Sequence, residues 1–214
     1  MGVLVRLLAV LFLIGVPVSG VLCAGDDQAE SPTSAVRETL EEVLRILDDP
    51  SFKAQNRAAE RRQRLEDTIS KRFDYREMAR RTLASQWKRL SEQERDEFVE
   101  LFKQFLSDRY AGRIEQYSGE RVEYLSERRE GPYAEVRTKL VSSKTQYPID
   151  YRLMNKGGRW YAYDIVADGI SLVKNYRSQF EKIIRNGSYQ ELVARLREGS
   201  VPDERQVAEN RAPR

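Results

Sequence analysis

Two strands, a glycine turn and a helix are predicted by the pattern of apolar and polar positions in the second half of the chain. Ile149, Tyr151 and Leu153 alternate with charged residues, which is the period of a strand with two unlike faces. Residues 155–158 then supply the glycines that a hairpin loop needs. Residues 160–166 are apolar or aromatic at nearly every position, as in a strand that is covered on both faces.

A helix is expected to follow this hairpin, with Asp168 or Ser171 as its cap. Its apolar positions recur every three or four residues and form one stripe, made of Ile170, Val173, Tyr176, Phe180 and Ile184. We expect the helix to fold back over the sheet. The space between the two is where the pattern places a candidate site.

Four more helices are predicted outside this unit. The first covers 34–47 and ends before Pro50, and a strongly basic segment, 52–72, follows with few apolar positions. Asp74 is expected to cap a short helix, and Ser91 with Glu94 forms a capping box at the start of a long one. The last helix is short and is marked by Tyr189, Leu192, Val193 and Leu196.

The strand candidates are 122–125, 133–141, 149–154 and 160–166, joined by turns, so they predict an antiparallel meander of about four strands. The fold class is therefore α+β. The domain is expected to span 35–198. A polar linker at 25–34 precedes it, and a disordered, charged tail at 199–214 follows it.

Residues 1–24 have the build of a secretory signal peptide: an early arginine, an apolar run and small residues near its end. An uncleaved anchor helix is the alternative, and Pro17 argues against it. A lipoprotein signal would need a small residue before Cys23, where the chain has Leu22. Export from the cytoplasm is therefore expected.

Composition excludes several classes of functional site. The chain has 214 residues, a net charge of +3, no histidine and one cysteine, Cys23, so a His-based triad, a His-ligated metal and a disulfide framework are excluded.

Asp150 and Asp164 are the one candidate pair of catalytic carboxylates, although structural roles in ion pairs and helix caps account for them better. The aromatic residues fall on apolar faces rather than among the basic runs, which argues against nucleic acid as a partner. The basic segment at 57–64 is either a solvated helix face or a docking surface for acidic headgroups or an acidic protein.

An ordered series of short motifs over residues 36–198 resembles the MlaC/Ttg2D (toluene-tolerance Ttg2) family of periplasmic phospholipid-binding proteins. No single motif is specific, but the series is. It consists of Phe73-Asp74-Tyr75, Met78-Ala79-Arg80, the stretch from Phe98 to Tyr110, Asp150-Tyr151-Arg152, Gly158-Arg159-Trp160, Tyr163-Asp164, Asp168-Gly169-Ile170-Ser171-Leu172 and Asn175-Tyr176-Arg177.

The resemblance implies a non-enzymatic phospholipid carrier in the periplasm that needs no cofactor. It implies helices packed against a curved, roughly four-stranded antiparallel sheet, with an apolar cavity between them for the acyl chains. The carrier would move lipid between an outer-membrane lipoprotein–porin complex and an inner-membrane ABC transporter with an MCE-domain protein, and so maintain the lipid asymmetry of the outer membrane. Two alternatives remain open: a periplasmic adaptor with a filled core and no lipid, and a small lyase or isomerase that uses Asp150 or Asp164.

The expected lipid-lining residues are apolar or aromatic and lie on elements predicted at the helix–sheet interface. Each of them is equally consistent with ordinary core packing. They are Met78, Leu83, Leu106, Tyr110, Tyr151, Tyr163, Ile165, Ile170, Leu172, Val173 and Tyr176. Arg80 and Arg177 match family positions and are expected near the headgroup or a docking partner, or else in surface ion pairs.

Overall fold

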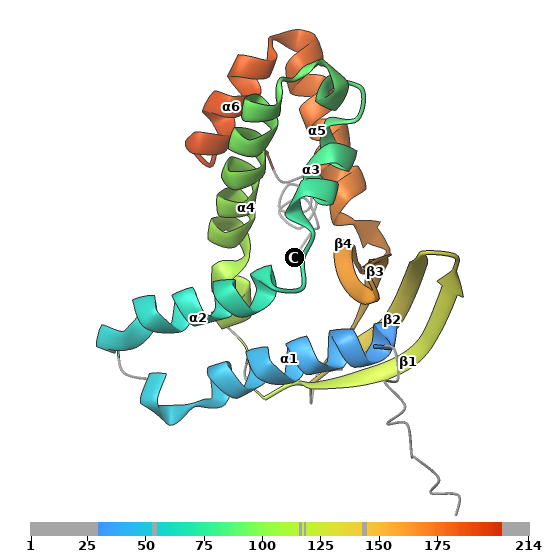
Figure 1. The fold of residues 1–214 in the computed structure, drawn as a ribbon. Coiled ribbons are helices and arrows are strands. Elements are labelled where there is room, and N and C mark those ends of the chain that lie inside the picture. The colour runs from blue at the N-terminus through green and yellow to red at the C-terminus, as the bar shows by residue number, and fades with distance from the viewer. Residues whose placement is uncertain (1–29, 53–54, 116, 118, 143–144, 203–214) are drawn as a thin grey trace, which may run out of the picture.

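The computed structural model describes residues 30–52, 55–115, 117, 119–142 and 145–202, and it shows six helices packed with one open antiparallel sheet (Figure 1). The predicted signal peptide and residues 203–214 of the predicted tail lie outside these ranges. In chain order the elements are α1 (Pro32–Asp48), α2 (Ala58–Ser70), α3 (Tyr75–Leu83), α4 (Glu92–Glu115), β1 (Arg121–Glu130), β2 (Tyr133–Val141), β3 (Gln146–Lys156), β4 (Arg159–Ala167), β5 (Ile170–Ser171), α5 (Leu172–Asn186) and α6 (Tyr189–Arg197).

The sheet confirms the predicted antiparallel meander, with the strand order β1-β2-β3-β4-β5. Gly157 and Gly158 form the β3–β4 turn with φ values of 59° and 84°, which favour glycine. The structure adds β5, two residues that pair with the end of β4. The pairing of β3 with β4 also shifts, because Arg152 lies opposite Asp164 while Leu153 lies opposite Ala162. Tyr163 is therefore an extra residue in β4, as in a β-bulge.

One face of the sheet is covered by α1 at one end (Figure 1). Ser31 caps this helix and accepts a hydrogen bond from the Ser34 amide at 2.9 Å, so the helix begins at Pro32 and takes in the last residues of the predicted linker. Ala35 and Val36 pack against Val136 of β2 and its neighbours. This sheet cluster also contains Ala134, Leu153, Trp160 and Ala162.

A second core lies among α3, α4, α5 and α6. The predicted capping box opens α4, since the Ser91 amide donates to the Glu94 carboxylate at 2.8 Å and the Glu94 amide donates back to Ser91 Oγ at 3.3 Å. Phe98 and Phe102 of α4 meet the ring of Phe180 of α5 edge to face, with centroids 5.9 and 5.6 Å apart. Val201 is also buried here, so the predicted disorder does not extend to this part of the tail.

Of the two residues expected to cap α5, the structure confirms Ser171, and two other expectations about this helix are wrong. Ser171 caps the helix, and its side chain accepts from the Lys174 amide at 3.0 Å. Asp168 instead has a φ of 52° in the tight turn before β5, and Ile170 lies in β5 rather than on the helix. The helix meets the sheet at its first turn and then runs beside α3, away from the strands, so it does not fold back over them (Figure 1).

No helix within the described ranges is both long enough and apolar enough to cross a membrane.

Candidate functional site

The strand register gives the sheet an inner face, which we define by Ala134, Val136, Tyr147, Ile149, Tyr151, Leu153, Ala162, Ile165, Ala167 and Ile170. Ile165 lies directly opposite Tyr151 on β3, and Ala167 lies opposite both Ile149 on β3 and Ile170 on β5. Side chains two residues apart on one strand share a face, so Tyr151, Ile165 and Ile170 are neighbours on this face.

The side chains of the inner face are buried to different extents at its two ends. At the end under α1, Val136 and Leu153 are fully buried. At the other end Ile149, Tyr151, Ile165 and Ala167 are half-buried, while Tyr147 and Ile170 are 54% and 45% exposed. We call these six residues the open end of the inner face. Contiguous exposed apolar side chains of this kind are typical of a surface that receives an apolar ligand.

The connection between α2 and α3 joins the two cores beside this face. Phe73 packs against both the sheet cluster and the helical cluster. The backbone on either side of it is bonded to β4, because the Asp74 amide donates to the Ala162 carbonyl and the Ala162 amide donates to the Arg72 carbonyl, both at 2.8 Å. Tyr75 stacks on Phe73 with centroids 6.0 Å apart. Burial raises the pKa of Tyr75 to about 12, so its hydroxyl stays neutral at pH 7.

The predicted lining residues divide between several places. Six are buried in the helical cluster: Met78, Leu83, Leu106, Leu172, Val173 and Tyr176. Tyr110 is partly buried against them, and its hydroxyl lies 3.3 Å from that of Tyr176. Tyr151, Ile165 and Ile170 lie on the inner face instead. The two groups therefore do not form one wall, although Phe73 packs against both clusters.

Tyr163 lies on the opposite, outer face of the sheet. Its ring meets that of Tyr133 edge to face with centroids 6.0 Å apart, and the Arg81 guanidinium lies 4.0 Å from its centroid. Tyr133 precedes Ala134 of the inner face, so its own side chain points outward. The extra residue in β4 explains the difference, because an inserted residue reverses the alternation that the sequence pattern assumes.

The two carboxylates that the sequence paired have different surroundings. Asp164 is buried and holds the start of α5: Oδ2 accepts from Arg152 at 3.0 Å and from Ser171 at 2.6 Å, and Oδ1 accepts from the Val173 amide at 3.0 Å. Asp150 pairs across the sheet with Val166 and Arg137 rather than with Asp164. Burial and the Glu135 charge raise the pKa of Asp150. Asp164 thus serves a structural role at a helix N-terminus.

The basic segment 57–64 is largely neutralised by its own neighbours. Arg57 binds Glu60 with N–O distances of 2.7 to 3.0 Å, and Arg62 contacts Glu66 and Asp108. Of the two arginines at family positions, Arg80 pairs with Glu77 and Arg177 with Glu181. These contacts favour the interpretation as solvated, ion-paired helix faces.

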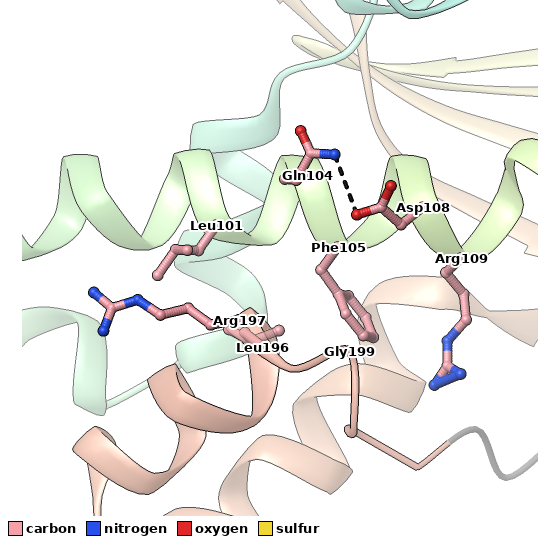
Figure 2. Close-up of a pocket in the computed structure, with 8 residues that line it drawn as sticks. All are labelled: Leu101, Gln104, Phe105, Asp108, Arg109, Leu196, Arg197 and Gly199. Atoms are coloured by element: carbon pink, nitrogen blue, oxygen red, sulfur yellow. Dashed lines mark hydrogen bonds between the residues drawn. The ribbon is translucent and has the colours of Figure 1, made fainter. Parts of the chain in front are cut away.

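Two pockets, of about 460 and 300 Å³, lie among α4, α5, α6 and residues 199–202, and no predicted lining residue borders either of them. The larger pocket lies between α4 and the end of α6 (Figure 2). Neither adjoins the open end of the inner face. The sequence pattern does not predict Tyr147, Ile149, Phe73 or Tyr75 as lining residues, although Ile149 belongs to the same alternation as Tyr151.

Comparison with known proteins identifies the family. The model of the family described as MlaC protein matches residues 37–198. The intermembrane phospholipid transport system binding protein MlaC of Haemophilus influenzae is 23% identical over 126 residues, which cover 56% of this chain and 59% of that protein. The toluene tolerance protein ttg2D of Pseudomonas putida is 28% identical over 116 residues, covering 53% and 54%. The alignments thus span a little over half the length of these curated relatives.

A solved structure has the same fold. The phospholipid-binding protein of Ralstonia solanacearum, determined in complex with a phospholipid, superposes with a TM-score of 0.72 at 24% identity. The match covers 84% of this chain and 99% of that one. Helices packed on an open antiparallel sheet are therefore shared by the two proteins.

Proposed function

The chain belongs to the MlaC family, and on this basis we propose that it is a phospholipid carrier whose cargo lies with its acyl chains on the open end of the inner face. The named relatives support the class of cargo, since one is an intermembrane phospholipid transport protein and another was solved with a phospholipid. The eleven predicted lining residues have different roles in this proposal. Tyr151, Ile165 and Ile170 would contact lipid directly, and those in the helical cluster would support the walls.

The observation that carries the proposal is the half-covered apolar surface of the sheet. Tyr151 and Ile165 lie side by side on it, and Tyr147 and Ile170 are exposed at its margin. Removing apolar side chains from water stabilises a protein by about 25 cal/mol for each Å² of surface, and these exposed side chains do not contribute that free energy. An acyl chain laid over them would remove both its own surface and theirs from water.

The energetics suit a carrier that releases its cargo. Burying a methylene group is worth about 0.8 kcal/mol, so two chains of about 15 carbons give roughly 24 kcal/mol relative to water. This exceeds the practical limit of about 18–21 kcal/mol for non-covalent binding. The relevant comparison is thus between the free energy of the acyl chains in the protein and in the bilayer, since both surround the chains with apolar groups. Lipid would pass between them without a chemical step, and directional transport would draw its energy from a partner.

We further propose that the protein works in the periplasm, between an outer-membrane lipoprotein–porin complex and an inner-membrane ABC transporter with an MCE-domain protein. In this role it would help to maintain the lipid asymmetry of the outer membrane. The predicted signal peptide supports export. No catalytic role is proposed, because both oxygens of Asp164 are taken up by Arg152, Ser171 and the Val173 amide.

The second candidate is a periplasmic adaptor with no lipid cargo. The observation in its favour is the close packing of the helical cluster, where Phe102, Tyr176 and Phe180 are fully buried and contact one another. An adaptor would use the same fold as a docking module for a membrane complex.

Native mass spectrometry of the mature protein purified from a periplasmic fraction separates the two candidates. A stoichiometric added mass that extracts into solvent as diacyl phospholipid is the expected result, and it would also identify the headgroup. A mass without lipid that stays unchanged after incubation with phospholipid vesicles would instead support the adaptor.

A further inference from the structure

The larger pocket has an apolar wall and three charged residues, which differ in whether they have ion-pair partners (Figure 2). Leu101 and Phe105 of α4 face Leu196 of α6 across a volume of about 460 Å³. This volume is in the lower part of the range of about 300–1,000 Å³ that is usual for small-molecule sites. The pocket is lined by α4, α6 and Gly199, so it is separate from the open end of the inner face.

Two of its three charged residues are neutralised by partners outside the pocket. Asp108 contacts Arg62 and accepts a hydrogen bond from Gln104 at 3.1 Å (Figure 2). Arg197 pairs with Glu97. Neither residue therefore adds an uncompensated charge to the site.

Arg109 differs from both. Its Nη2 donates to the Val201 carbonyl, its guanidinium lies 5.1 Å from the centroid of the Phe105 ring, and its other neighbour is the Tyr176 hydroxyl. All three are neutral groups. Within the described part of the chain no carboxylate forms an ion pair with Arg109, and its buried Nε has no hydrogen-bond partner. A half-buried guanidinium without a counter-charge favours an anion beside it.

We propose that this pocket binds a single-chain anionic amphiphile, with its carboxylate or phosphate on Arg109 and its alkyl chain against Leu101 and Leu196. The planar guanidinium matches the geometry of carboxylate and phosphate oxygens. The apolar wall would take the chain out of water. A pocket of this size favours one chain over the two of a diacyl phospholipid. Fatty acids and lysophospholipids share this chemistry.

Calorimetric titration with dodecanoate, below its micelle concentration, tests the proposal. The mature protein would carry Ile165→Lys, which puts a charge on the inner face and so limits binding there. In this background Arg109→Gln is expected to lower dodecanoate affinity about tenfold or more, because a charge-assisted contact is lost. Arg197→Gln is the matched control: it removes an arginine from the same pocket, but one already paired with Glu97, and should change the affinity little.

Dodecanol, which has the same chain without the charge, should bind less tightly than dodecanoate. A lysophospholipid titrated in parallel would tell whether carboxylate or phosphate is preferred. Equal affinity in the Arg109→Gln and Arg197→Gln proteins would overturn the proposal. So would an absence of binding by both probes.

A second variant tests the same pocket in case Arg109→Gln does not fold. Leu101 is half-buried, so Leu101→Glu should fold while placing a negative charge in the pocket, and it should abolish dodecanoate binding. Dodecanoate binding that survives Leu101→Glu would contradict the assignment. In the wild-type background, Arg109→Gln and Leu101→Glu should still purify with diacyl phospholipid, so the outcome here is independent of the proposed carrier function.

Discussion

Asp164 links the sheet to α5 through hydrogen bonds with Arg152, Ser171 and the Val173 amide. Asp150 lies on β3, where it pairs with Arg137 and Val166 instead. Asp164→Asn should lower the free energy of unfolding by about 2–3 kcal/mol, because an amide cannot accept at both atoms and would set an N–H against a donor. Urea denaturation at neutral pH measures the difference.

Asp150→Asn is the matched control. A raised pKa in the folded state means that ionised Asp150 opposes folding at pH 7, so removing its charge should leave stability unchanged or slightly higher. Equal losses in the two variants would contradict the role assigned to Asp164.

Glu77 illustrates how charge contributes on the helical side. Burial favours the neutral acid, but hydrogen bonds from Arg80 and Arg81, at 2.6 to 2.7 Å, outweigh burial and lower the pKa of Glu77 below its ordinary value of 4.5. A lowered folded-state pKa gives stability that is present above the ordinary value and lost as the pH falls through the folded pKa.

Glu77→Gln should therefore cost about 1–3 kcal/mol at pH 7, and the gap between wild type and variant should shrink steadily as the pH falls below 4.5. Denaturation curves of both proteins over a pH series provide the measurement. A gap that does not change with pH would show that the charge of Glu77 contributes nothing.

At the scale of elements, the first turn of α5 depends on a serine with two functions. Ser171 caps the helix and also donates to Asp164 at 2.6 Å. Ser188 caps α6 by accepting from the Glu191 amide at 3.1 Å. Ser171→Ala should cost about 2 kcal/mol and Ser188→Ala about 1 kcal/mol, since only the first also leaves a buried carboxylate with fewer donors. Thermal unfolding compares the two, and an equal loss would argue against the coupling of cap and carboxylate.

Elements marked by local signals were predictable from the sequence. The capping box of Ser91 and Glu94 and the glycine turn between β3 and β4 both depend on residues within one turn of each other. For the start of α5 the local signals left Asp168 and Ser171 open as caps, and they placed Ile170 wrongly on the helix. Residues 168–171 form a turn and a short strand because β5 pairs with the end of β4, a contact that periodicity does not reveal. The length of β1 was also underestimated, because this edge strand is mostly charged beyond Leu125.

The candidate site was predictable only in part, for the same reason. Alternation placed Ile149, Tyr151 and Leu153 on one face, as the structure shows. It could not place Tyr163, because the bulge that turns this residue outward depends on pairing between two strands. Nor could it separate the residues that fill the helical cluster from those on the inner face, since both sets are apolar.

At the scale of the whole molecule, the two faces of the sheet should differ in their effect on lipid. Ile165 on the inner face and Met154 on the outer face are both half-buried strand residues. Ile165→Lys should sharply reduce the phospholipid that purifies with the protein, because a charge would then lie against the acyl chains. Met154→Lys should leave the phospholipid content near that of the wild type. Extraction and quantification of lipid per protein gives the comparison, and similar losses in both would place the cargo elsewhere.

The position of the cargo can be measured directly by photo-crosslinking. The residue p-benzoylphenylalanine would replace Tyr151 on the inner face, or Tyr161, a half-buried residue on the outer face, in protein purified with its cargo. After irradiation, intact mass spectrometry should show a covalent phospholipid adduct at position 151 and none at position 161. Adducts of equal yield at both positions, or an adduct at 161 alone, would contradict the claim that lipid lies on the inner face of the sheet.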